Sequence, residues 1–252
     1  MRNIKLSGAV ASVLCLFLTA CVTTPAPVRT GKLPVQEEAA QNEAETELET
    51  ETELGLPTQD MLPSAAPPQG TFVPDLALNV CPIRVRNAPP SQPDGRITDY
   101  GQLFVIDNVI ALATVPVNGA CLSSGFGVRD GRLHKGIDLS APRGTWVFSA
   151  APGIVREAGW HGAFGYYILI EHGYNVFTRY AHLEAFVEGL EIGSEIGFGW
   201  PIAQVGNSST QNIGVHLHYE VLTGNYQTPK KAFGLNAHDP FGFPVYVPQP
   251  SS

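Results

Sequence analysis

The sequence has few charged residues and lacks any basic cluster. Only 15% of the 252 residues are charged, and no block of Lys and Arg is present that would neutralise a run of phosphates. Nucleic-acid binding is therefore not expected. Long stretches of helical period are also lacking after residue 123, whereas 26 Gly and 21 Pro favour a turn-rich, β-rich protein.

The negative charge of the chain is concentrated in a short segment near its beginning. Eight glutamates lie between Glu37 and Glu53. Residues 22–70 contain nine acids and two bases, a net charge of −7, whereas residues 71–252 contain fourteen acids and eleven bases, a net of −3. A segment so poor in large apolar residues cannot offset its ordering entropy. We expect residues 21–70 to be a disordered, extended tether.

The first twenty residues are typical of a secretory signal peptide. Arg2 and Lys5 precede an uncharged, mostly apolar run over residues 6–20, which is too short to span a bilayer comfortably. Residues 18–21, Leu-Thr-Ala-Cys, resemble a bacterial lipobox, which implies cleavage before Cys21 and lipid on its thiol. Val22 in place of Asp then indicates an outer-membrane lipoprotein facing the periplasm. The alternative is an ordinary signal peptide with a chance cysteine.

Only four cysteines are present, and the predicted signal peptide and lipobox account for two of them. Cys15 leaves with the signal peptide and Cys21 is lipidated. Cys81 and Cys121 remain in a compartment where disulfides persist, so a bridge between them is expected. The alternative is two unpaired buried thiols. Neither has a neighbour at the spacing of zinc ligands.

The rest of the chain is predicted to be mainly β, with an antiparallel, sandwich-like domain at residues 121–245. Short runs rich in β-branched and aromatic residues are separated by Gly, Pro or Asn; they cover residues 145–150, 153–158, 166–171, 176–182 and 215–222. Residues 71–120 are interpreted as an extension packed on this domain. Within it, residues 102–114 are apolar enough for a strand or a short helix, and periodicity does not decide which.

Three histidines and an aspartate stand in arrangements that suggest metal chemistry. His216 and His218 alternate on a predicted strand, so both project from one face. They could serve one metal together, or divide into a ligand and a proton carrier. His134 and Asp138 are spaced so that their side chains can converge. Two imidazoles and a carboxylate suit zinc, and three protein ligands leave the open position of a catalytic site.

The residues around these positions resemble the lysostaphin-type family of zinc peptidases. The resemblance runs in order through about 110 residues. It includes an opening motif, a first metal motif, central strands, a glycine-spaced turn region and a last motif, found here at residues 124–129, 134–145, 165–173 with 179–183, 192–206 and 214–220. It covers nothing before about residue 120.

The resemblance implies a role for each residue of the site. His134, Asp138 and His218 would bind zinc, and His182 and His216 would be the catalytic histidines. The implied activity is that of a metalloendopeptidase that cuts cross-links or stem peptides of peptidoglycan, with the D-alanyl to diaminopimelate cross-link as leading candidate. Cell-wall amidases and the division machinery are the candidate partners. Residues 207–214 depart from the family's usual Thr-Gly-x-Ser-Thr-Gly-Pro run, which affects the shape of this loop.

Two other interpretations stay open at the level of sequence. Some lysostaphin-type domains have lost their ligands and activate cell-wall amidases by binding alone, although all five site positions are kept here. D,D-carboxypeptidases with a related HxH site place the Asp further from the first His. The remaining histidines are expected to be structural at His172 and exposed in loops at His161 and His238.

Overall fold

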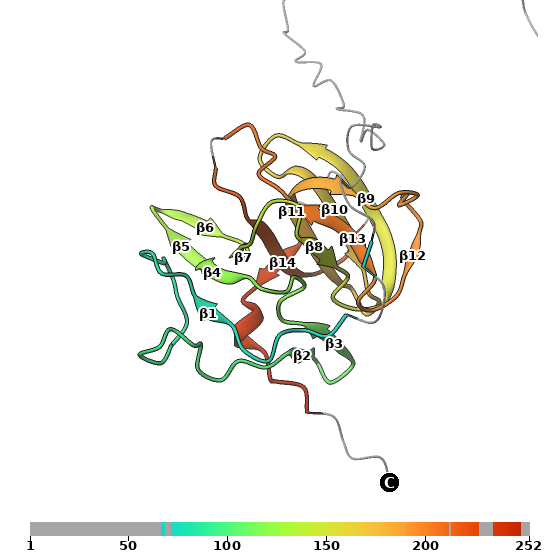
Figure 1. Ribbon diagram of the computed structural model, residues 1–252. Helices are drawn as coiled ribbons and strands as arrows, with labels where there is room; N and C mark the ends of the chain where they lie inside the picture. The colour runs from blue at the N-terminus through green and yellow to red at the C-terminus, as the bar shows by residue number, and fades with distance from the viewer. Residues whose placement is uncertain (1–66, 69–71, 212, 227–233, 248–252) are drawn as a thin grey trace, which may run out of the picture. The chain divides into compact units, whose positions relative to one another are not determined.

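The computed structural model describes residues 67–68, 72–211, 213–226 and 234–247, all within one compact unit, Thr50–Ser252. Within these ranges nearly all regular structure is β, which confirms the predicted mainly β class (Figure 1). None of the helices in this part of the chain is long and apolar enough to span a membrane. The predicted signal peptide, Cys21 and all of the predicted tether except residues 67–68 lie outside the described residues.

The described elements are fifteen strands and a short 3-10 helix. They are β1 Asn79–Val80, β2 Leu103–Ile106, β3 Ile110–Ala113, β4 Cys121–Ser124, β5 Gly127–Arg129, β6 Arg132–His134, β7 Ile137–Ser140, β8 Trp146–Phe148, β9 Gly153–His161, β10 Gly165–Glu171, β11 Val176–Phe186, β12 Glu195–Ile196, β13 Pro201–Val205, β14 Leu217–Thr223, β15 Asn236–His238 and η2 Pro240–Gly242.

A single 11-stranded sheet forms most of the fold. Its main path runs β1-β4-β7-β14-β11-β10-β9-β12, with β13 and β8 joined through β11 and β15 joined to β14. Every pairing is antiparallel except that of β1 with β4. The eleven residues of β11 are almost all buried, because β14 and β10 pair with its two edges. Figure 1 shows β11 between these two strands.

Alternation along β14 separates the core from the site. Leu217, Tyr219 and Val221 are fully buried in the main hydrophobic core. His218 and Glu220 project from the opposite face, as the period of a strand requires. The same strand therefore anchors the sheet and carries polar groups for chemistry.

The segment before residue 121 packs closely against the strands that follow it. The ring of Phe72 stacks on that of Phe148 with centroids 4.3 Å apart, and the Tyr219 hydroxyl donates to the Ala113 carbonyl at 3.1 Å. Cys81 and Cys121 form a disulfide. The division of the chain into segments 1–20, 21–70, 71–120 and 121–245 stays a prediction.

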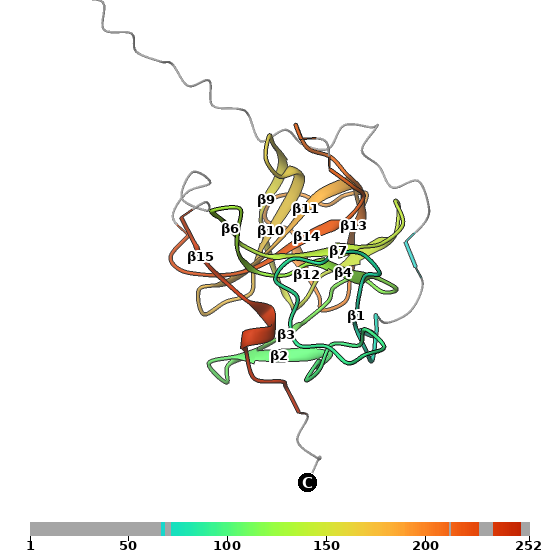
Figure 2. The ribbon, with the colours of Figure 1, turned by 90° about the vertical axis from the view of Figure 1, so that its left-hand side faces the viewer.

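The ambiguous run 102–114 forms the β2–β3 hairpin, which lies below the main sheet in both views (Figures 1 and 2). Asp107 and Asn108 adopt positive φ values of 48° and 56°, as a tight hairpin turn requires. The expectation that His161 and His238 are exposed loop residues is wrong. His161 ends β9 and His238 ends β15, and both are half-buried.

Candidate metal centre

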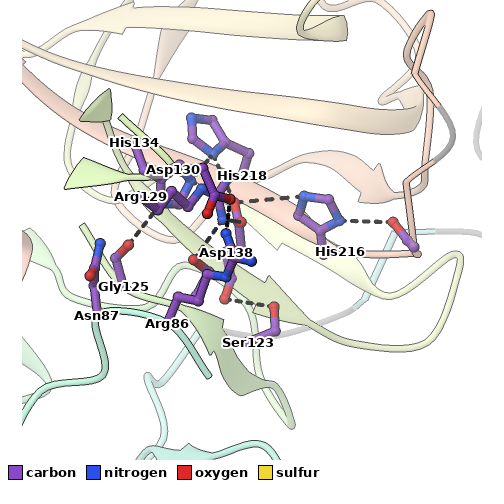
Figure 3. Close-up of polar contacts among 12 residues, drawn as sticks. Arg86, Asn87, Ser123, Gly125, Arg129, Asp130, His134, Asp138, His216 and His218 are labelled. Carbon is purple, nitrogen blue, oxygen red and sulfur yellow. Dashed lines mark hydrogen bonds and ion pairs between the residues drawn. The ribbon is translucent and has the colours of Figure 1, made fainter. Parts of the chain in front are cut away.

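The site forms where two paired strands of the main sheet meet a hairpin. Asp138 on β7 and His218 on β14 are direct partners in the antiparallel register, so their side chains stand next to each other. His134 comes from β6. The β5–β6 hairpin turns at Asp130 and Gly131, whose φ values of 51° and 76° fit a type I′ turn. Figure 3 shows His134, Asp138 and His218 directed toward one another.

Three ligand atoms converge on one point. The Nε2 atom of His134 lies 3.1 Å from Oδ1 of Asp138 and 3.1 Å from Nδ1 of His218. The third separation, from Nδ1 of His218 to Oδ1 of Asp138, is 2.9 Å. Tetrahedral ligands at ~2.0–2.1 Å from a zinc ion lie about 3.3 Å apart, close to these values. All three side chains are buried.

The other ring nitrogen of each ligand histidine already has a partner. Nδ1 of His134 lies 2.7 Å from the Gly125 carbonyl oxygen, to which its N–H donates. Nε2 of His218 lies 3.1 Å from Oε1 of Glu220. Glu220 is itself paired with the buried Arg179. Such outer contacts fix the tautomer and direct the remaining lone pair at a metal.

The three converging atoms, Nε2 of His134, Nδ1 of His218 and Oδ1 of Asp138, need a positive charge among them. With both outer nitrogens donating their protons, two imidazole lone pairs and a carboxylate oxygen face one another. Burial opposes the charged form of His218, but hydrogen bonds to Asp138 and Glu220 outweigh it and raise its pKa to about 9. A proton or a metal ion satisfies this need, and the donor set fits a metal ion of the zinc type.

The second oxygen of Asp138 is bound by an arginine. Nη1 of Arg129 lies 3.2 Å from Oδ2 of Asp138 and donates to Oγ of Ser124 at 2.6 Å. Burial would raise the pKa of Asp138, but hydrogen bonds from His134 and His218 and their charge hold it well below its usual value. Asp138 is thus ionised and presents one oxygen to the metal position.

Two further histidines stand beside the three ligands. Nε2 of His216 lies 3.6 Å from Oδ1 of Asp138, while its Nδ1 donates to the Gly214 carbonyl at 2.8 Å. The His182 ring centroid lies 4.8 Å from that of His216, and its Nδ1 donates to the Ser208 carbonyl at 2.9 Å. Each ring thus keeps an unprotonated Nε2. His182 also has a φ of 62°, a strained backbone for a non-glycine residue.

Burial keeps both of these rings neutral. Burial, together with the charges of the neighbouring His218 and His216, lowers the pKa of His182 to about 4. Burial also lowers the pKa of His216, more than the charge of Asp138 raises it. Near neutral pH both rings can accept a proton.

The three ligands and the two further histidines all line an open cleft of about 1000 Å³. One wall is the β5–β6 hairpin. The lining also includes Ala163 and Phe164 from the turn before β10, and Gln211 and Ile213 from the loop before β14. The space is large enough for an extended peptide segment rather than a single small group.

Four supporting groups were not singled out from the sequence. Glu220 had a signal, because it lies two residues after His218 and so on the same strand face. Arg129 belongs to the opening motif but had no assigned contact. Gly125 and Ser208 act through backbone carbonyls, which any residue type would supply, so the sequence carried no signal for them.

Comparison with known proteins shows what the sequence around this cleft is similar to. Residues 132–229 match the sequence model of Peptidase family M23. Over 107 residues the chain is 42% identical to the DD-carboxypeptidase/endopeptidase Mpg of Neisseria meningitidis serogroup B, covering 39% of this chain and 24% of the relative. The L-Ala--D-Glu endopeptidase of Bacillus subtilis is 34% identical over 110 residues, covering 41% of this chain and 33% of the relative.

A solved structure is also similar. A zinc-containing peptidase from Vibrio cholerae superposes with a TM-score of 0.46 at 26% identity, covering 57% of this chain and 47% of the other. The chain spans about a quarter to a third of the length of the two curated relatives.

Proposed function

From the match of residues 132–229 to peptidase family M23, we propose that the chain is a zinc-dependent endopeptidase that hydrolyses peptide bonds of peptidoglycan. One observation carries the proposal. His134, Asp138 and His218 direct three ligand atoms at one point in a cleft, while two neutral histidines stand beside them. A closed structural metal site would have four protein ligands and no adjacent proton carriers.

Zinc is the metal proposed for this ligand set. Two imidazoles and one carboxylate are typical ligands of catalytic zinc. When bound, zinc would polarise the scissile carbonyl and lower the pKa of a water to ~7. Asp138, His134 and His218 would hold it, with Glu220 and the Gly125 carbonyl fixing the two imidazoles.

His216 and His182 supply the proton transfers. Each directs its Nδ1–H at a backbone carbonyl, so Nε2 is the atom that exchanges protons with the reactants. One ring accepts a proton from the attacking water and returns it to the leaving amine, and the other stabilises the tetrahedral oxyanion by hydrogen bonding. A neutral ring with a bare Nε2 suits the accepting role as it stands, whereas the ring that stabilises the oxyanion must carry a proton on Nε2 in order to donate.

Peptidoglycan is proposed as substrate because the lysostaphin-type resemblance implies it, and because a relative from Vibrio cholerae, 35% identical over 89 residues, is named a peptidoglycan DD-endopeptidase. The two relatives described above are named for DD and for L-Ala--D-Glu activity. These names refer to different bonds. We keep the D-alanyl to diaminopimelate cross-link as the leading candidate.

The address proposed for the enzyme follows from its N-terminal sequence. Lipid on Cys21 would anchor the chain in the outer membrane, with the acidic segment extending the domain toward the wall from the periplasm. Replacement of Cys21 by Ser should release the protein from the membrane fraction and abolish labelling by a palmitate analogue. Labelling that persists in the Cys21→Ser variant would contradict the lipid assignment.

The enzymatic proposal is tested with the full-length chain purified in detergent. Zinc content is measured first, and cross-linked muropeptides are then incubated with the protein with and without a chelator. We expect zinc to be present and dimeric muropeptides to be converted to monomers, with loss of conversion after chelation. Absence of zinc would favour the non-catalytic amidase activator instead. Intact dimers in the presence of bound zinc would refute the choice of substrate bond.

A further inference from the structure

Two arginines lie opposite each other on the hairpin that forms one wall of the cleft. Arg129 on β5 and Arg132 on β6 are direct partners in the register, on either side of the Asp130–Gly131 turn. Both side chains line the cleft. Like charges directly opposite each other in a β ladder destabilise it, so this pair has a cost that an anion would remove.

Strand alternation directs this pair toward the metal position. Arg132 and His134 are two residues apart on β6 and therefore share a face of the hairpin. Arg129 lies across from Arg132 on that same face. Because His134 points at the metal position, both guanidinium groups stand on the reacting side of the cleft.

The acids near this pair are already engaged. Asp130, in the turn between the two arginines, forms an ion pair with Arg86. Asp138 faces Arg129, but it is held by His134 and His218 as well. Among the described residues no acidic group lies within ion-pair distance of the exposed Arg132.

The guanidinium of Arg129 is held in place with donors to spare. Both of its hydrogen bonds to described residues, to Ser124 and to Asp138, use Nη1. Its side chain is 35% exposed. Nε and Nη2 thus remain as donors on a fixed planar group whose residue lines the cleft, and this pair of donors can bind a carboxylate through two parallel hydrogen bonds.

We propose that Arg129 and Arg132 bind a free carboxylate of the peptide substrate next to the scissile amide. The inference rests on the proposed peptidase function and narrows it to peptides that carry such a carboxylate. Nη1 of Arg129 lies 3.2 Å from Oδ2 of the ligand Asp138. A carboxylate bound at this guanidinium would therefore lie within about one or two residues of the reacting carbonyl, since one residue spans ~3.3–3.6 Å.

Arg132 is the better residue to replace, because it touches no ligand of the metal position. The probes are two synthetic stem peptides of the same sequence, one with all carboxylates free and one with all of them amidated. Binding to the full zinc-loaded chain is measured by calorimetry with peptides that are not cleaved. Cleavage of the corresponding cross-linked pair is measured in parallel.

We expect Arg132→Gln to weaken binding of the free-carboxylate peptide and raise its KM by about tenfold, the size expected for a charge-assisted hydrogen bond. The amidated peptide and the zinc content should not change. Arg132→Lys should recover part of the effect. The matched control, Arg96→Gln, removes the same charge from an exposed site outside the lining of the cleft.

Equal affinity of the wild-type chain for the two peptides would overturn the proposal, as would an equal loss in Arg96→Gln and Arg132→Gln. Discrimination in binding without any cleavage would support the carboxylate site and refute the peptidase function. Cleavage of both peptides with equal KM would leave the peptidase function standing and refute the carboxylate site.

Discussion

The Nε2 atom of His218 lies 3.1 Å from Oε1 of Glu220, two residues further along the same strand. Glu220 is buried and paired with the buried Arg179, whose guanidinium lies 4.7 Å from the Phe164 ring centroid. A carboxylate behind a ligand imidazole fixes the ring and makes it a better donor to a metal. Strand alternation thus builds the ligand and its support into one sequence, His-x-Glu.

Glu220→Gln should weaken metal binding while leaving all three ligands in place. Its amide oxygen can still accept from His218, but the negative charge that strengthens the imidazole is lost. Loss of such an outer contact typically costs about 10–100-fold in metal affinity. The metal affinity of the folded variant is measured by competition with a chromophoric chelator. Glu188→Gln, at an exposed carboxylate, is the control, and an unchanged affinity in Glu220→Gln would argue against the supporting role.

Replacements of His216 and His134 should separate the proton carriers from the ligands. His216→Ala removes a ring whose Nε2 is 3.6 Å from Asp138 but which is not one of the three converging ligands. It should keep its zinc and lose about 10²–10⁴-fold in turnover. His134→Ala should lose both. Zinc content and muropeptide cleavage are measured together, with His238→Ala as control. Loss of zinc from His216→Ala would show that His216 is a metal ligand and not a proton carrier.

The sequence pattern predicted the strand that carries His218 because its side chains alternate strictly, whereas β6 and β7, which carry His134 and Asp138, were not among the predicted strands. Residues 215–222 could be assigned to a strand, and the period of two then put His216 and His218 on one face. In the structure β14 spans Leu217–Thr223 and both rings line the same cleft. The register that sets Asp138 beside His218 depends on a pairing between distant strands, which periodicity within one strand does not encode.

Other features could not be predicted because they depend on contacts between distant segments. The apolar run 102–114 fitted a strand or a helix until the turn at Asp107 and Asn108 divided it into a hairpin. His161 and His238 were expected in exposed loops. Pairing with Gly165 on β10 and Val221 on β14 instead incorporates them into the sheet.

Gly125→Ala should disturb the metal position, because the backbone at Asn87 packs against Gly125 and Gly125 holds the ring of His134. A Cβ at residue 125 would lie 1.8 Å from the carbonyl oxygen of Asn87, so the backbone must move. The carbonyl of Gly125 accepts the Nδ1–H of His134, and its displacement should release that ring. We expect metal affinity to fall by about 10–100-fold.

Chelator competition again measures the effect of Gly125→Ala. The matched control is Gly242→Ala, whose Cβ would meet only the Asp239 side chain at 3.7 Å. If both glycine variants bind metal as tightly as the wild-type chain, the contact between Asn87 and Gly125 does not support His134.

The stability of the metal-free protein should fall as the pH is lowered from 6.5 toward 4, in part through His172. Burial lowers the pKa of this ring to about 4, with Nδ1 donating to the Pro152 carbonyl at 2.9 Å and Nε2 lying 2.7 Å from Oγ1 of Thr178. Between these pH values the unfolded chain binds a proton that the folded chain does not, so acid favours unfolding. The neutral His172 ring therefore makes its full contribution to the free energy of unfolding above about pH 6.5, and this contribution falls as the pH is lowered toward 4. Between pH 7.5 and pH 5 the loss from this one group is about 2 kcal/mol.

Urea unfolding in the presence of a chelator, at both pH values, measures this loss. His172→Gln lowers stability at both pH values but should make the difference between them smaller by about 2 kcal/mol, because its side chain does not titrate. Asn236→Gln, at an exposed side chain of β15 that does not titrate, should retain the wild-type difference. His182 also has a pKa near 4, so the His172→Gln variant keeps part of the acid sensitivity. An unchanged pH difference in His172→Gln would mean that this ring is protonated equally in the folded and unfolded chains.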